Sequence, residues 1–358
     1  MQEGISRRSL LTASAALGSR RNLAAAAADI KVGLYSITYL GLWYRGEALT
    51  VEDLVRRARE YGYQGVEIDG KRPHGCPLLW PRERCRRFRQ FARDQGVVLC
   101  GVAANNDFSS PIPEHREAQL AWVRDLIRMT ADLGAGILRV FLAWPGATKA
   151  PEGGGRYDIA QRIWDAAHQD VPEEQAWEWC RHCLIEAARY AGDYGVTLAL
   201  QNHRPIITNY RQMLQMIREV GSPYLKACLD APILERKDPE YVRQAVLDTG
   251  ALQVQSHFGG EYERPKPDGP ILRAAVRRQP DGRYERQGYE DMHNDYYLPF
   301  VRALIDIGYR GFINYELCHP LPVVQGRTVG IEFVDASARL AAEYMRGIIA
   351  RAQAGASA

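Results

Sequence analysis

Four polar residues stand at the ends of short apolar segments that read LALQ, CLD, VQSH and NYE: Gln201, Asp230, His257 and Glu316. Two carboxylates, an imidazole and an amide oxygen form a mixed oxygen and nitrogen set that suits a divalent metal ion such as Mn²⁺, Mg²⁺ or Zn²⁺. If the four side chains meet, they predict a metal site. The alternative is a polar rim in which each group is satisfied by hydrogen bonds.

The same region offers candidates for proton transfer. The amide of Gln201 cannot take a proton at neutral pH, whereas the carboxylate of Glu316 can, so Glu316 is the predicted base. His203, two residues past Gln201 on the same strand face, is the predicted second acid or base, with a hydrogen-bonded rim histidine as the alternative. Glu67 is a third candidate, and it could equally bind a hydroxyl group of a substrate.

Other residues after strand ends suggest how a substrate would be held. Arg139 could bind a carbonyl, a carboxylate or a hydroxyl, or it could pair with Glu67 as a structural bridge. Aromatic side chains could form apolar walls against a substrate, although each alone is more often simple packing. These are Trp43, Tyr44, Trp144 and Phe258.

A repeated pattern of strands and helices must position these residues. After residue 30, eight apolar segments alternate with eight helical ones, and a glycine closes each of the first seven helices. Glycine suits the left-handed position after a helix. The pattern predicts an α/β protein with one domain, a parallel (β/α)8 TIM barrel over residues 30–350, followed by a disordered tail at 351–358. A doubly wound open sheet is the alternative, but YSITYLGLWYRG is no glycine-rich phosphate turn.

In such a barrel, the loops after the strands carry the active site. Three of these loops are long, at residues 70–81, 144–171 and 259–292. The last is charged and rich in glycine and proline. It could cover a substrate, and it is also where disorder is most expected.

Polar groups on four consecutive strands give the chain a family resemblance. It resembles the xylose isomerase-like TIM barrels of the sugar phosphate isomerase/epimerase family over residues 30–350. The resemblance implies a metal ligand on each of strands 5 to 8, which Asp230, His257 and Glu316 match, while Gln201 departs from the usual glutamate. In this family the strand 5 and strand 8 carboxylates move a proton beside a carbonyl, with the metal holding an enediolate.

The predicted function is a metal-dependent sugar isomerase or epimerase. One base with one acid also fits a lyase that performs β-elimination on an oxidised keto-glycoside. A third possibility is an exported carbohydrate-binding protein without catalysis. A DNA-repair endonuclease is disfavoured, because only eight scattered histidines and no basic face are present.

Composition limits the partners and the location. The net charge of +3 arises from 46 basic and 43 acidic residues, which argues against nucleic acid and against stable membrane association. Residues 1–29 contain Arg7–Arg8 before a short apolar run, which resembles a twin-arginine export signal, with a disordered tail as the alternative. We therefore expect a periplasmic or secreted protein that binds a small sugar or keto-glycoside and could form a homo-oligomer. A lone C-x-x-C at Cys180 and Cys183 lacks the second pair that a zinc site would need.

Overall fold

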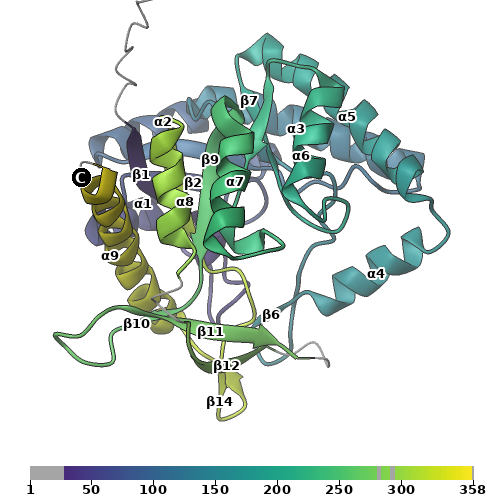
Figure 1. The fold of residues 1–358 in the computed structure, drawn as a ribbon. Helices are drawn as coiled ribbons and strands as arrows, with labels where there is room; N and C mark the ends of the chain where they lie inside the picture. Colours follow the sequence, from purple (N-terminus) through teal and green to yellow (C-terminus); the bar gives the residue numbers. More distant parts are fainter. Residues whose placement is uncertain (1–27, 280–283, 291–294, 357–358) are drawn as a thin grey trace, which may run out of the picture.

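The computed structural model describes residues 28–279, 284–290 and 295–356 and contains a closed barrel of eight parallel strands (Figure 1). Around the barrel the strand order is β1, β13, β9, β8, β7, β4, β3, β2. Their bounds are β1 Asp29–Tyr35, β2 Gly65–Asp69, β3 Val98–Ala103, β4 Ile137–Val140, β7 Thr197–Gln201, β8 Leu225–Cys228, β9 Gln253–Gly259 and β13 Arg310–Glu316. The predicted single-domain TIM barrel is confirmed, and the open sheet is excluded because β1 pairs with both β2 and β13.

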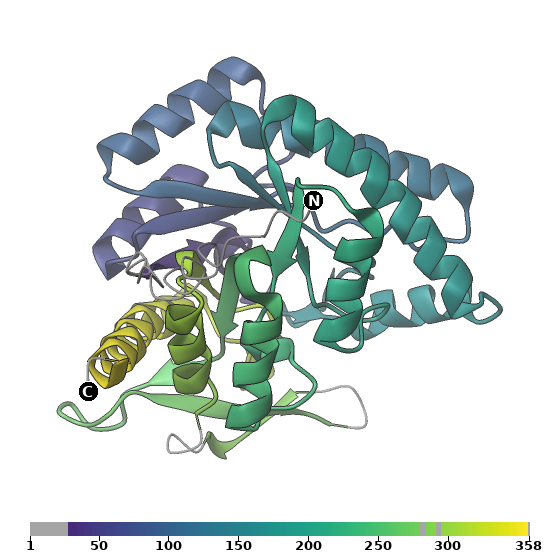
Figure 2. The ribbon, with the colours of Figure 1, turned by 45° about the horizontal axis from the view of Figure 1, so that its top comes forward.

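Helices surround the strands, as Figure 2 shows from a second direction. They are α1 Val51–Tyr61, α2 Arg82–Asp94, α3 Pro113–Leu133, α4 Asp158–His168, α5 Glu173–Tyr194, α6 Tyr210–Val220, α7 Pro239–Thr249, α8 Tyr297–Asp306 and α9 Ile331–Ala356. Short 3-10 turns lie at Ser36–Tyr39, Pro77–Leu79, Ala231–Ile233 and Gly250–Leu252. None of the helices in the described ranges is long and apolar enough to cross a membrane.

Helix α1 shows how the sequence sets these boundaries. Thr50 caps its first turn by accepting a hydrogen bond from the backbone N–H of Asp53. Its apolar residues at helical spacing, such as Leu54 and Ala58, are fully buried. Gly62 follows at φ 79°, in the left-handed region that other residues avoid. All seven predicted terminal glycines have positive φ, so this sequence signal located the helix ends correctly.

The inner face of the barrel requires one very close approach. A Cβ on Gly33 of β1 would lie 2.0 Å from Oδ1 of Asn314 on neighbouring β13. Only glycine leaves room for that side chain. Asn314 in turn pairs in register with His257 on β9. The absence of a side chain on Gly33 therefore makes room for Asn314, which lies beside His257 in the site.

The long loops gather at one end of the barrel and carry structure of their own (Figure 1). The loop after β4 contains a small hairpin of β5 (Thr148–Lys149) and β6 (Gly155–Arg156) before α4. The loop after β9 forms a three-stranded sheet of β10 (Tyr262–Glu263), β11 (Leu272–Arg278) and β12 (Tyr284–Tyr289). A third hairpin pairs β14 (Val323–Val324) with β15 (Arg327–Thr328). The loop in which we expected disorder is thus ordered over its described residues.

The C-terminal boundary differs from the prediction. Helix α9 continues through Ala356, so the expected disordered tail from residue 351 is wrong for most of its length. Ala338, Met345 and Ala352 are fully buried on one side of this helix, and that apolar spacing extends its packed face beyond residue 350. The predicted export signal at residues 1–29 lies outside the described residues except for Ala28 and Asp29, and Asp29 already begins β1.

Candidate functional site

A cavity of about 460 Å³ opens at the carboxyl ends of the barrel strands. The strands and the long loops both contribute to its wall. Its lining includes Tyr35, Trp43, Lys71, Asn105, Arg139, Trp144, Tyr157, Gln201, His203, Arg278, Tyr284 and Glu316. Its size falls in the range of small-molecule sites. Six of the predicted site residues therefore share one cavity: Trp43, Arg139, Trp144, Gln201, His203 and Glu316.

Glu67 lies beneath this cavity and is fully buried. Its Oε1 accepts a hydrogen bond from Nε of Arg139 at 2.9 Å. Its Oε2 accepts from Nδ2 of Asn314 at 2.9 Å and lies 2.5 Å from Nε2 of His257. Burial alone would raise the pKa of Glu67, but the charges of Arg139 and His257 hold it below its ordinary value. With both oxygens occupied, Glu67 orients other groups, so its prediction as an acid or base is not supported by this arrangement.

His257 lies between two carboxylates. Its Nε2 faces Glu67, and its Nδ1 lies 3.1 Å from Oδ2 of Asp230. The backbone N–H of His257 also donates to Oδ1 of Asp230 at 2.8 Å. Burial and nearby Arg139 act to lower the pKa of His257, but the two carboxylates outweigh them and raise it well above its ordinary value. The same contact holds the pKa of Asp230 below its ordinary value against the effect of burial.

The amide of Gln201 joins Arg139 to Asp230. Its Oε1 accepts a hydrogen bond from Nη1 of Arg139 at 3.1 Å, and its Nε2 donates to Oδ2 of Asp230. Arg139 has one further nitrogen, Nη2, which is buried without a hydrogen-bond partner in the described part of the chain. Both sequence interpretations of Arg139 therefore have support, because it bridges to Glu67 and also lines the cavity.

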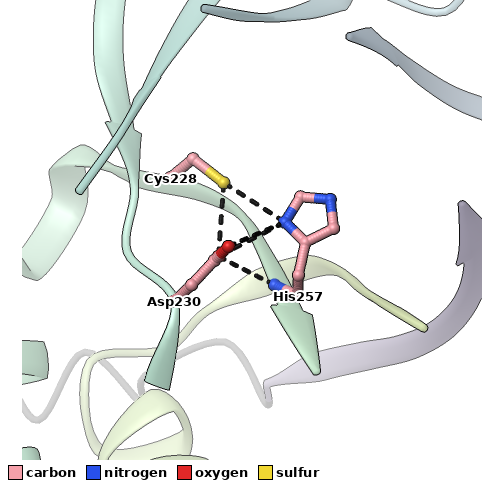
Figure 3. Close-up of side chains that lie close together, drawn as sticks. All are labelled: Cys228, Asp230 and His257. Atoms are coloured by element: carbon pink, nitrogen blue, oxygen red, sulfur yellow. Dashed lines mark hydrogen bonds and ion pairs between the residues drawn. The ribbon is translucent and has the colours of Figure 1, made fainter. Parts of the chain in front are cut away.

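The structure groups a different set of metal-binding side chains from the predicted one. Across the described residues, the one group of three or more such side chains consists of Cys228, Asp230 and His257, whose ligand atoms lie within 4.8 Å of one another (Figure 3). Their spacing alone would allow an ion, but Asp230 and His257 already use these atoms in hydrogen bonds to one another. Glu316 is not a member, and Gln201 turns its N–H, rather than its oxygen, toward Asp230.

The predicted four-ligand site therefore does not fit these residues as arranged. A hard divalent cation needs oxygen lone pairs, but the oxygen of Gln201 is taken by a guanidinium. The thiol of Cys228 is a soft ligand, and burial raises its pKa to about 12. For these reasons, no step proposed below depends on a metal ion.

Glu316 ends β13 and lines the cavity, where it is partly buried. Burial raises the pKa of its carboxyl group above the ordinary value, although the charges of His257 and Arg139 partly oppose this effect. A raised pKa makes a carboxylate a better proton acceptor once it is ionised. Glu316 therefore lies where a base could reach a substrate, and its role as the base stays a prediction.

His203 also lines the cavity, beside Phe141 and Trp144 at ring-centroid distances of 5.3 and 5.0 Å. Its Nδ1 meets the backbone carbonyl of Arg204. Because that carbonyl can only accept, Nδ1 carries the hydrogen and Nε2 is left as an acceptor. Burial lowers the pKa of His203 to about 4, so its ring is neutral near pH 7. His203 is thus placed to accept or relay a proton rather than to act as a cationic acid.

Aromatic residues form one wall of the cavity. Trp43 and Trp144 both contact Tyr157, at ring-centroid distances of 4.9 and 5.9 Å. The other two predicted wall residues lie elsewhere. Tyr44 is buried with its hydroxyl on the backbone oxygens of Tyr39 and Glu47, and Phe258 packs outside the barrel against Tyr262, Tyr297 and Tyr315. Phe258 faces outward because its neighbour His257 faces inward.

Several residues of the site were missed in the sequence. Cys228 and Asn314 each precede a predicted site residue by two positions, so strand alternation places them on the same inward face. That spacing could have identified both. Tyr157 and Tyr284 come from the long loops after β4 and β9, and no periodic signal indicates which loop residues return to the cavity.

These features define a TIM barrel with a polar site at its carboxyl end. The chain matches the family model described as xylose isomerase-like TIM barrel over residues 55–342. The protein belongs to this family. No curated protein matches it by sequence.

Solved structures with the same fold include sugar epimerases. D-psicose 3-epimerase with D-tagatose from Clostridium cellulolyticum H10 has 18% identity and a TM-score of 0.60, over 89% of this chain and 99% of that one. L-ribulose 3-epimerase has 18% identity and a TM-score of 0.60, over 92% and 97%. The IOLI protein with a binding zinc atom has 14% identity and a TM-score of 0.58, over 90% and 98%. At such identities the likeness establishes the fold.

Proposed function

We propose that the protein is an enzyme of the sugar isomerase/epimerase type, which removes a proton from the carbon beside a carbonyl group. The observation that carries the proposal is one cavity lined both by a carboxylate with a raised pKa, Glu316, and by the guanidinium residue Arg139. Structural neighbours that are sugar epimerases support the same class.

The chemistry needs a base and a charge that stabilises the product of proton removal. The carboxylate of Glu316 takes the proton, and the electron pair of the broken C–H bond forms the C=C bond of an enediolate. The carbonyl oxygen becomes negative and accepts a hydrogen bond from Arg139. A fixed donor in a buried site stabilises such developing charge more than water does. Return of the proton to the other face or to the neighbouring carbon gives an epimer or an isomer.

His203 is the proposed partner for the second proton step. Its neutral ring lies in the same cavity, so it can pass a proton between the substrate and the solvent. Gln201 is excluded because an amide does not exchange protons at neutral pH. Glu67 is bound by three partners and serves to fix Arg139 and His257.

Elimination on a keto-glycoside is the second candidate. The amide of Gln201 favours elimination. An epimerase needs two groups that exchange protons, one on each face of the substrate, whereas elimination can use a single such group. Glu316 would take the proton beside the ketone and return it to the departing alkoxide, which gives an unsaturated ketone and an alcohol. The apolar wall of Trp43, Trp144 and Tyr157 suits the group that leaves.

We further propose that the protein is exported and acts in the periplasm or outside the cell on a small molecule. The arginine pair before the short apolar run supports this location. Glycosides are the more plausible substrates there, since sugar phosphates are mostly cytoplasmic.

NMR in D₂O with a panel of keto-sugars and keto-glycosides tests the proposed function. We expect deuterium to enter the carbon beside the carbonyl in at least one substrate. Release of an alcohol identifies elimination, and exchange without release identifies epimerisation or isomerisation. Glu316→Gln should abolish both reactions. If the wild type binds the panel without exchange or release, the protein is a binding protein and the proposal fails.

A further inference from the structure

Five side chains from five barrel strands form a closed ring of hydrogen bonds below the cavity. Arg139 on β4 donates to Glu67 on β2, which meets His257 on β9. His257 meets Asp230, which follows β8, and Asp230 accepts from Gln201 on β7. Gln201 accepts from Arg139, which closes the ring. All five residues are at least nine-tenths buried.

Donor and acceptor chemistry fixes the direction of each bond in this ring. A guanidinium only donates and an ionised carboxylate only accepts. Gln201 must therefore turn its oxygen toward Arg139 and its NH₂ toward Asp230. A reversed amide would set N–H against N–H at one end and oxygen against oxygen at the other. The oxygen that could bind a metal ion is thus held away from Asp230 and His257.

The ring also occupies the atoms that would bind a metal ion. The ring nitrogens of His257 each face a carboxylate oxygen, Nε2 that of Glu67 at 2.5 Å and Nδ1 that of Asp230 at 3.1 Å. Oδ2 of Asp230 also accepts from Gln201, and Oε1 of Gln201 accepts from Arg139. The side chains that would supply the ligand atoms are thus bonded to one another.

We propose that this ring stands in place of a divalent metal ion, with Gln201 as the residue that closes it. Glutamine at position 201 supplies the N–H that Asp230 needs, whereas a glutamate there would place two carboxylates in contact and add a negative charge. The inference concerns how the site holds its charge, and it stands whether or not the proposed reaction is correct.

Gln201→Glu is the variant that distinguishes a hydrogen-bonded ring from a metal-binding site. The new carboxylate would still accept from Arg139, but it would repel Asp230 and open the ring at that point. A divalent cation then relieves the repulsion between the two carboxylates. Gln161→Glu is the matched control, because Gln161 lines the same cavity but lies outside the ring.

The experiment measures metal content and thermal unfolding for the three proteins, each equilibrated with Mn²⁺, Mg²⁺ or Zn²⁺ and then dialysed. We expect wild type and Gln161→Glu to retain far less than one ion per chain and to show no shift in Tm with added ion. Gln201→Glu should hold about one ion per chain, with a rise in Tm of about 5 °C at 100-fold excess over its Kd.

Wild-type protein that retains one ion per chain would overturn the inference, and so would a folded Gln201→Glu protein that gains none. Circular dichroism shows whether that variant is folded. If it is not, the wild-type titration decides alone, because the ring predicts that no divalent ion stabilises the wild-type chain.

Discussion

Glu316 is the residue on which the proposed chemistry depends. It is partly buried in the cavity wall, and burial favours its protonated form over its carboxylate. The proposed base is therefore held in a form that is costly to ionise, which makes the ionised form more reactive.

This burial predicts a pH-dependent difference in stability between wild type and Glu316→Gln. The pKa of this carboxyl group is higher in the folded protein than in the unfolded protein. Such a group contributes to stability at pH values below its unfolded pKa, and this contribution is lost as the pH rises through the folded pKa. We expect the free energy of unfolding of the variant, relative to that of wild type, to rise between about pH 4 and about pH 8. Urea unfolding at both pH values checks this. A difference that does not change with pH would contradict the raised pKa.

At the scale of single residues, the sequence predicted positions better than orientations. Asp230 and His257 were expected to meet, and they lie 3.1 Å apart. The direction of the Gln201 amide could not be predicted, because it is set by Arg139 from a strand 62 residues earlier. Phe258 was placed on the wrong face, although the inward position of His257 already implied that its neighbour points outward.

At the scale of elements, β4 is tied to β2 by the buried pair of Arg139 and Glu67 at 2.9 Å. Removal of Arg139 leaves the buried carboxylate of Glu67 with fewer partners and takes the donor away from Oε1 of both Glu67 and Gln201. Arg139→Met should therefore lower the free energy of unfolding by about 3–5 kcal/mol. Chemical denaturation measures this loss.

The double variant Arg139→Met/Glu67→Gln is the control for that prediction. It removes both charges of the pair, so it should recover part of the stability that Arg139→Met loses. Equal stability of the single and double variants would show that the pair is not the cause.

The loops contain the elements that could not be predicted from the sequence. Strands and helices follow from apolar periodicity and terminal glycines, and these located all eight units of the barrel. The sheet of β10, β11 and β12 was not predicted, because its charged, proline-rich sequence has no strand alternation. Tyr284 and Arg278 reach the cavity from this sheet, so much of the substrate wall could not be read from the sequence.

At the scale of the whole molecule, the proposed export signal makes a prediction that is independent of the barrel. The described structure begins with β1 at Asp29, close after the alanine cluster of the proposed signal. We expect protein recovered from the periplasm to begin near residues 26–30. N-terminal sequencing checks this. An intact Met1 on the exported protein, or export that survives replacement of Arg7 and Arg8 by lysine, would count against the signal.

The central claim is that Glu316 removes a proton beside a carbonyl while Arg139 stabilises the carbonyl oxygen. The site needs no metal ion for this step. The most direct test of this claim is proton exchange by protein that has been dialysed against EDTA and shown by elemental analysis to hold below about 0.1 ion per chain. In D₂O, this protein should label its keto-sugar or keto-glycoside substrate within about twofold of the untreated rate, and Glu316→Gln should slow labelling by about 10²-fold or more. Exchange that disappears with the ion and returns with Mg²⁺ or Zn²⁺ would contradict the account.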